Sequence, residues 1–130
     1  MTIVVVDDEP SIVRMCVQVL QAKGHTVSGF TKASEALAHL GTSATDLLVV
    51  DYKMPELTGL EFIKKAWQIR PGMRVVMITA HGTREVMAKA AENGVQTIVL
   101  KPFTPGELAE GVAKAVGQLG GEPPPPGAPR

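Results

Sequence analysis

The sequence predicts an α/β fold in which five parallel strands form one doubly wound sheet, with helices on both faces. Four short apolar runs indicate central strands, because each is continuous and not alternating, as is typical of strands buried on both faces. A fifth segment, 25–30, alternates polar and apolar residues and indicates a strand nearer the edge. Helix-length stretches separate these strands, and such strict alternation favours right-handed crossovers. The four runs are 3–6, 47–50, 75–78 and 98–100.

Start and stop signals predict five helices between and after these strands. Pro10 suits the first turn of a helix, where its missing N–H needs no partner, and Gly24 marks where this helix should end. A second helix is expected over 32–40, after Thr31, with Gly41 as its stop. The remaining three begin at threonines, two of them in capping boxes: 58–70 with Thr58 and Glu61, 83–94 with Thr83, and 104–119 with Thr104 and Glu107.

Composition excludes several classes of protein. The 130 residues are the size of one domain, and 13 basic residues against 13 acidic ones give a net charge of zero. A surface for nucleic acid or for an anionic membrane needs an excess of Lys and Arg, so neither is expected as a partner. Cys16 is the one cysteine, which excludes a disulfide framework. No apolar run approaches the ~20 residues of a membrane span, and we expect a cytoplasmic protein.

The chain divides into a folded domain over 1–119 and a tail over 120–130. The tail contains five of the ten prolines and almost no side chain that could be buried. We expect it to be a flexible tail or a linker.

Polar side chains follow four of the predicted strands and should meet at one edge of the sheet, where ligands bind in open α/β folds. Three carboxylates brought together repel one another, and a hard divalent cation relieves this repulsion, which predicts Mg²⁺. A lysine and a hydroxyl beside such a metal suit a tetrahedral anion, and a carboxylate can act as the nucleophile in phosphoryl transfer. Asp51, alone on its strand, is the natural candidate. The residues are Asp7, Asp8, Asp51, Thr79 and Lys101.

Together these residues resemble the receiver domain of bacterial two-component response regulators. The resemblance covers about 2–119 and rests on four features in the expected order. These are the acidic pair in Val6-Asp7-Asp8-Glu9-Pro10, Asp51 followed by Met54-Pro55 and Gly59, Thr79-Ala80, and Lys101-Pro102-Phe103. It implies a flavodoxin-like (βα)5 fold with the strand order 2-1-3-4-5.

The resemblance also implies roles for individual residues. Asp51 would accept a phosphoryl group from a sensor histidine kinase or a phosphotransfer protein. Asp8, Asp51 and the backbone carbonyl of Lys53 would ligate Mg²⁺, and Asp7 would act mostly through bound water. Thr79 would donate a hydrogen bond to the phosphoryl group and Lys101 would pair with it.

Further positions surround this expected centre. The family implies a cis bond before Pro102, a small residue, Ala80, beside the opening for the phosphodonor, and an influence of Lys53 and His81 on the lifetime of the phosphoryl group. The last strand, the last helix and the helix before it would form the output face, for an effector protein or domain or for a second copy of the chain.

One position departs from the family pattern. Receivers often carry Tyr or Phe three residues before the lysine, and here that position is Ile98. The threonine-to-aromatic switch of the family is therefore in question, and we interpret Ile98 as a residue that signals by packing.

Two other functions remain open at this point. An aspartyl-phosphate phosphatase would usually need a second aspartate two residues after the nucleophile, where Lys53 stands. A phosphorylation-independent interaction module would tend to lose the acidic pair or the lysine, and both are present. We therefore predict a signalling switch and not a metabolic enzyme.

Overall fold

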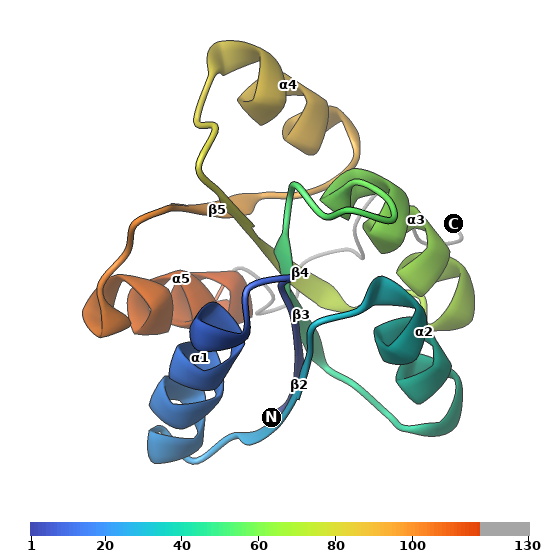
Figure 1. Cartoon of the computed structure of the whole chain (residues 1–130), viewed down its shortest axis with the longest axis vertical. Coiled ribbons are helices and arrows are strands. Elements are labelled where there is room, and N and C mark those ends of the chain that lie inside the picture. Colours follow the sequence, from blue (N-terminus) through green and yellow to red (C-terminus); the bar gives the residue numbers. More distant parts are fainter. Residues whose placement is uncertain (118–130) are drawn as a thin grey trace.

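The computed structural model describes residues 1–117, in which five strands alternate with five helices (Figure 1). In chain order they are β1 (Thr2–Val6), α1 (Pro10–Ala22), β2 (Thr26–Phe30), α2 (Ala33–Thr42), β3 (Leu47–Asp51), α3 (Gly59–Ile69), β4 (Arg74–Thr79), α4 (Arg84–Glu92), β5 (Thr97–Leu100) and α5 (Pro105–Gly117).

All five strands form one parallel sheet in the order β2-β1-β3-β4-β5, which confirms the predicted fold class. Helices α1 and α5 cover one face of the sheet, and α2 and α3 cover the other (Figure 1). Two apolar clusters fill the spaces between the sheet and these helices. The largest buried side chain is Trp67 of α3, whose indole Nε1 donates a hydrogen bond to the Met73 carbonyl at 2.9 Å. Each fully buried Val, Leu or Ile contributes about 1.5–3 kcal/mol to this core.

The strand over 98–100 is less buried than its apolar run predicts. Leu100 is 51% exposed, because β5 lies at the edge of the sheet and pairs with β4 alone. The interpretation of this run as a central strand was therefore wrong. The edge position predicted for the strand over 25–30 is confirmed by β2.

Most of the predicted helix ends are confirmed. Thr58 and Glu61 form the expected capping box, and Thr104 and Glu107 exchange the same pair of hydrogen bonds. The Thr83 hydroxyl accepts from the Val86 N–H at the start of α4. The chain leaves α1, α3 and α4 through glycines with positive φ, a conformation that costs other residues steric strain: Gly24, Gly72 and Gly94.

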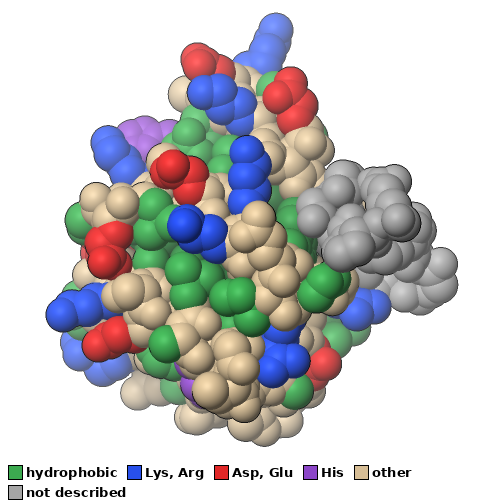
Figure 2. All heavy atoms as spheres, turned by 90° about the vertical axis from the view of Figure 1, so that its right-hand side faces the viewer, with side chains coloured by type: hydrophobic (Ala, Val, Ile, Leu, Met, Phe, Trp, Pro, Cys, Tyr) green, Lys and Arg blue, Asp and Glu red, His purple; other side chains and the backbone are tan. Residues whose placement is uncertain are grey.

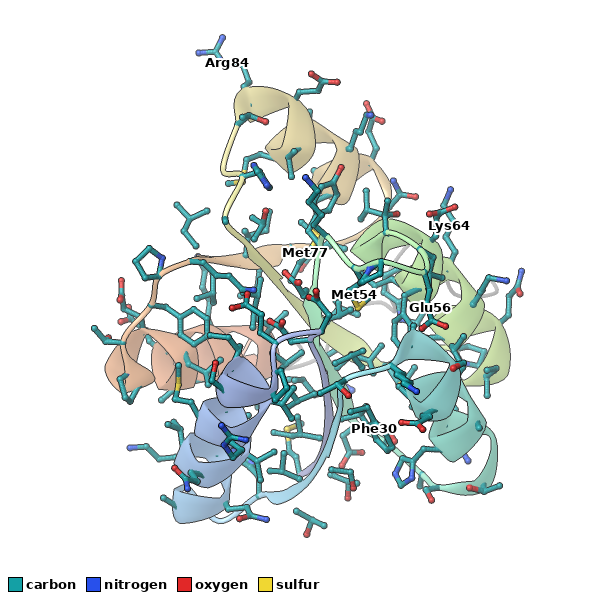
Figure 3. All side chains as sticks on the ribbon, viewed as in Figure 1. Phe30, Met54, Glu56, Lys64, Met77 and Arg84 are labelled. Carbon is teal, nitrogen blue, oxygen red and sulfur yellow. The ribbon has the colours of Figure 1, made fainter. Side chains whose placement is uncertain are left out.

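Helix α2 differs from the prediction at both ends. It begins after Lys32, whose side chain makes no capping hydrogen bond, and it continues through Gly41 to Thr42. Gly41 does not stop the helix because its φ is not positive. The first N–H group of α2, that of Ala33, instead donates to Glu56 Oε1 at 3.1 Å. Glu56 comes from the loop after β3 (Figure 3), so a distant residue caps this helix.

Positive and negative side chains are interspersed on the face seen in Figure 2. That face shows no field of a single charge, in agreement with the zero net charge. None of the helices formed by residues 1–117 is long and apolar enough to cross a membrane. The proposed tail over 120–130, and Leu119 at the end of the proposed domain, lie outside the described residues.

The start of α3 lies very close to the end of the strand that carries Asp51, and Gly59, which has no side chain, allows this approach. Its N–H donates to the Tyr52 carbonyl at 2.6 Å, and a Cβ at this position would lie 2.5 Å from the Asp51 carbonyl oxygen. A side chain here must therefore displace either α3 or the backbone of Asp51.

We predict that Gly59→Ala destabilises the fold by about 1–3 kcal/mol, because the new methyl group collides with backbone. The matched variant is Gly41→Ala, in α2, where a Cβ meets nothing within 4 Å. It should stabilise the fold by about 0.5–1 kcal/mol, because alanine loses less entropy in a helix. Urea unfolding of the two variants tests this, and equal free energies of unfolding would contradict it.

Candidate functional site

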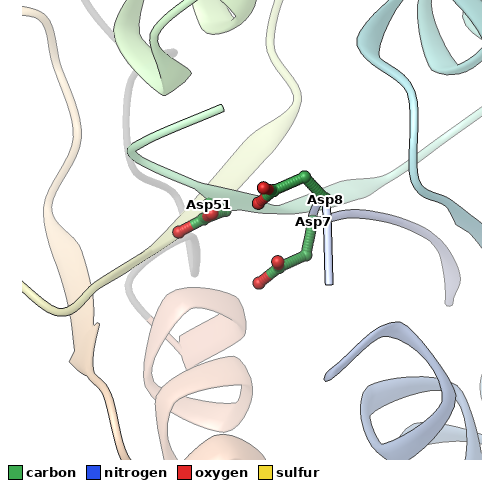
Figure 4. A group of neighbouring side chains, drawn as sticks. All are labelled: Asp7, Asp8 and Asp51. Carbon is green, nitrogen blue, oxygen red and sulfur yellow. The ribbon is translucent and has the colours of Figure 1, made fainter. Parts of the chain in front are cut away.

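Three aspartates meet at the carboxyl ends of two neighbouring strands. Asp7 and Asp8 directly follow β1, and Asp51 is the last residue of β3, the strand that pairs with β1. A carboxylate oxygen from each of the three lies within 4.8 Å of the others (Figure 4). Asp7 and Asp51 are buried, whereas Asp8 is exposed. Sheet pairing thus brings together residues that are more than forty positions apart in the sequence.

Lys101 supplies the positive charge of this cluster. It directly follows β5, and its N–H donates to the Thr79 carbonyl at 2.8 Å, which continues the pairing of β4 with β5. Its Nζ lies 3.0 Å from Asp7 Oδ2, 3.0 Å from Glu9 Oε1 and 3.4 Å from Asp51 Oδ1. The peptide bond between Lys101 and Pro102 is cis.

Burial and mutual repulsion shift the proton affinities of these groups. Burial raises the pKa of Asp51 to about 7, and the Asp7 carboxylate adds to this shift, although Lys101 opposes it. Burial also raises the pKa of Asp7. Burial alone would lower the pKa of Lys101, but Glu9 and Asp7 outweigh it and raise that pKa above its ordinary value. The lysine therefore stays charged while the buried carboxylates bind protons more readily.

One buried oxygen of the cluster is left without a hydrogen bond. Asp7 Oδ1 accepts from the Glu9 N–H at 2.9 Å, but Asp7 Oδ2 accepts no hydrogen bond of good geometry within residues 1–117, and Lys101 meets it as an ion pair. The Lys101 ammonium compensates the charge of this buried oxygen in part, and an ordered water or a metal ion could satisfy its remaining acceptor capacity. Together with two further carboxylates this oxygen forms an all-oxygen donor set, so the three aspartates could bind a metal ion.

The loop after β4 brings a hydroxyl to the same edge of the sheet. Thr79 is the buried last residue of β4 and follows Ile78, which pairs with Asp51. In this structure its Oγ1 accepts a hydrogen bond from the His81 N–H at 2.9 Å. The hydroxyl proton is thus free to be donated to another acceptor.

A cavity of about 410 Å³ opens above the cluster. It is lined by Asp8, Glu9, Asp51, Lys53, Met54, Pro55, Ala80, His81 and Lys101. The structure therefore brings Lys53, Ala80 and His81 to the mouth of the site, where the sequence analysis expected them. Ile98 is not among the lining residues: it pairs with Met77 and packs against the apolar cluster that includes Ala90 of α4.

Glu9 is the residue of this site that the sequence analysis missed. Glu9 belongs to the acidic motif after the first strand, but the motif alone indicates no role for it. Its position two residues after Asp7 could have indicated that it belongs to the site. In the turn after β1 the Glu9 N–H donates to the Asp7 carboxylate, and the Glu9 carboxylate accepts from Lys101.

Comparison with known proteins agrees with this geometry. The family model of the response regulator receiver domain matches residues 3–113. The chain is 34% identical over 115 residues to the DNA-binding transcriptional regulator NtrC of Azospirillum brasilense, covering 88% of this chain and 24% of that protein. It is 26% identical to the chemotaxis protein CheY of Thermotoga maritima, covering 86% of this chain and 94% of CheY.

A crystal structure of a CheY-like receiver domain from Methanospirillum hungatei superposes with a TM-score of 0.83 at 29% identity, over 90% of this chain and 94% of that one. The chain belongs to the response regulator receiver domain family, and it is a signalling switch of two-component systems, not a conventional enzyme. It spans about a quarter of the length of larger relatives such as NtrC.

The raised pKa of Asp51 predicts a specific dependence of stability on pH in the absence of metal. The pKa rises from 3.8 to about 7 on folding, so the carboxylate destabilises the folded state as pH increases from about 4 to 7. The variant Asp51→Asn lacks this charge. We expect its free energy of unfolding to exceed that of the wild type by on the order of 2–4 kcal/mol at pH 8, and the difference to vanish near pH 4.

Urea unfolding in EDTA at several pH values measures this difference. Glu35→Gln, which removes an exposed carboxylate in α2, is the charge-matched control. A difference between the wild type and Asp51→Asn that stays constant with pH would contradict the prediction.

Proposed function

We infer that this domain accepts a phosphoryl group on Asp51, in a Mg²⁺-dependent reaction with the phosphohistidine of a sensor histidine kinase or a phosphotransfer protein. One observation carries the proposal: the buried Asp51 carboxylate lies 3.4 Å from Lys101 and beside an Asp7 oxygen that accepts no hydrogen bond. A nucleophile, a cation and carboxylate oxygens that could bind a metal ion thus lie together at one edge of the sheet.

Each residue of the site would have a distinct role in the phosphoryl transfer. Asp51 would attack phosphorus, the P–N bond to the donor histidine would break, and the imidazole would leave with the electron pair and take a proton from solvent. Lys101 would pair with one phosphoryl oxygen and the Thr79 hydroxyl would donate to another. Asp8, Asp51 and the Lys53 carbonyl would hold Mg²⁺, with Asp7 acting through bound water, and the ion would supply positive charge where negative charge accumulates.

Phosphorylation would change the structure through the loop after β4. If the Thr79 hydroxyl turns to the phosphoryl group, its hydrogen bond with the His81 N–H at 2.9 Å must change, and the start of α4 with it. Ile98 packs against the apolar cluster that includes Ala90 of α4, so a displacement of α4 would repack Ile98. Ile98 would then transmit the signal by packing in place of a buried aromatic hydroxyl.

The output surface would be formed by α4, β5 and α5. Met87 and Leu100 are exposed large apolar side chains on α4 and β5, at 40% and 51%. Such residues suit the contact with a downstream effector protein or domain, or with a second copy of this chain. The relatives that the chain matches over a quarter of their length include transcriptional regulators. An output domain on the same chain and a separate effector are both compatible with the proposal.

Phosphorylation is expected to need both Asp51 and Mg²⁺. Incubation with radiolabelled acetyl phosphate should label the wild type in Mg²⁺, and label should fall at least 20-fold in EDTA or in Asp51→Asn, because the metal and the nucleophile are both required. Asp46→Asn, at an aspartate before β3 and outside the cavity, should label normally. Equal labelling of Asp51→Asn and the wild type would refute the proposal.

The lifetime of the phosphoryl group should depend on Lys53 and His81, which line the mouth of the cavity. We expect Lys53→Ala and His81→Ala to change the dephosphorylation rate about threefold or more, since they alter the access of water, and to change the yield of phosphorylation less. Loss of label after removal of the donor gives the rate. Half-lives equal to that of the wild type would contradict this.

A further inference from the structure

Glu9 occupies a place at the site that none of the proposed steps uses. Its Oε1 lies 3.0 Å from Lys101 Nζ, closer than Asp51 Oδ1 at 3.4 Å, and the contact is a hydrogen-bonded ion pair. The Lys101 side chain is 13% exposed and that of Glu9 is 57% exposed. Glu9 is thus the solvent-side partner of an ammonium group that is otherwise enclosed by the buried aspartates.

The backbone of Glu9 is held firmly, which makes this contact a feature of the fold. Its N–H donates to Asp7 Oδ1 at 2.9 Å, and its carbonyl accepts from the N–H groups of Ile12 and Val13 at the start of α1. Glu9 is the N-cap residue of α1, yet its side chain makes no capping hydrogen bond. A side chain at an N-cap commonly satisfies the first N–H groups of its helix. The Glu9 carboxylate extends to Lys101 instead.

The contact between Glu9 and Lys101 affects the net charge that an incoming phosphoryl group meets at the site. Four carboxylates, those of Asp7, Asp8, Glu9 and Asp51, face two ammonium groups, those of Lys53 and Lys101. A doubly charged metal cation would bring the formal sum to zero, so an incoming phosphoryl group would gain no net attraction. Glu9 is also the acidic group that competes with a phosphoryl oxygen for Lys101 from the open side of the cavity.

We propose that Glu9 is a specificity-determining and positioning residue that selects phosphoryl donors by their charge. This rests on the proposed function of Asp51. Glu9 repels small donors that carry only negative charge and holds Lys101 in the resting state. A donor that presents a basic side chain beside its phosphohistidine neutralises Glu9, releases Lys101 to the phosphoryl group and reacts faster. In that reaction the P–N bond breaks, the P–O bond to Asp51 forms, and Glu9 exchanges no atoms.

Small donors of different charge test the repulsion. Acetyl phosphate carries two negative charges at neutral pH and phosphoramidate carries one. In Mg²⁺ and low salt, Glu9→Gln should be phosphorylated by acetyl phosphate about fivefold faster than the wild type, and by phosphoramidate less than twofold faster. Both ratios should approach one in 0.5 M salt, where exposed charges are screened.

Peptide donors test the recognition of a basic neighbour. Two synthetic phosphohistidine peptides differ only in an arginine or a glutamine beside the phosphohistidine. The wild type should react severalfold faster with the arginine peptide, and Glu9→Gln should not distinguish the two. Glu9→Asp, which keeps the charge, should retain a preference for arginine.

Glu35→Gln removes an equal charge from an exposed position in α2 and should behave as the wild type with every donor. The substitution at Glu9 should change the free energy of unfolding little, because Lys101 keeps its ion pairs with Asp7 and Asp51 and the exposed Glu9 side chain does not cap α1.

The outcomes separate this proposal from the function on which it rests. If no donor labels Asp51 in any of these proteins, the proposed function fails. If the wild type is labelled at Asp51 but Glu9→Gln shows the same rates and the same peptide preference, the role of Glu9 is overturned and the proposed function stands. If Glu9→Gln and Glu35→Gln accelerate the reaction equally, the effect is one of net charge only and the role of Glu9 is again overturned.

Discussion

The whole arrangement depends on keeping two buried carboxylates, Asp7 and Asp51, side by side in a poorly solvated place. Burial favours the protonated form of both carboxyl groups, and the charge of Asp7 favours protonation of Asp51 further. Lys101, 3.0 Å from Asp7 and 3.4 Å from Asp51, opposes both shifts without cancelling them. Removing Lys101 would leave both carboxylates without their cation, whereas neutralising Asp51 relieves the repulsion from Asp7. The repulsion among these carboxylates, which costs the folded state free energy, is also what makes the site attractive to a metal cation.

The sheet provides the rigidity that this electrostatic arrangement requires. β1 and β3 lie next to one another, so Asp7 and Asp51 cannot separate without breaking backbone hydrogen bonds. Gly59 lets α3 approach the backbone of Asp51, and the N–H of Lys101 bonds to the Thr79 carbonyl. The segment that can respond to a phosphoryl group is the loop after β4, where the His81 N–H donates a hydrogen bond to the Thr79 hydroxyl oxygen. A rigid cluster of charge beside an adjustable loop is the basis of a switch.

Local sequence patterns predicted the helix ends where the stabilising contact is itself local. The capping boxes at Thr58 and Thr104 and the glycine ends at Gly24 and Gly94 involve residues within one or two turns of each other. The prediction for α2 failed because its first N–H group is satisfied by Glu56, 23 residues away. A contact of that sequence separation leaves no periodic signal. The exposure of Leu100 was missed for a related reason, since a run of three apolar residues reads the same at the edge of a sheet as at its centre.

By itself, the sequence determined the fold class, because the period of apolar residues and the turn residues act over a few positions. It also determined which side chains stand at the strand ends, and these are the residues of the candidate site. Only the tertiary structure decided which of them share a cation, how deeply each is buried, and therefore how far their pKa values move. The role of Glu9 belongs to this second group. Its carboxylate meets Lys101 across 92 positions, and the energy of such a contact depends on distance and burial, which no local pattern encodes.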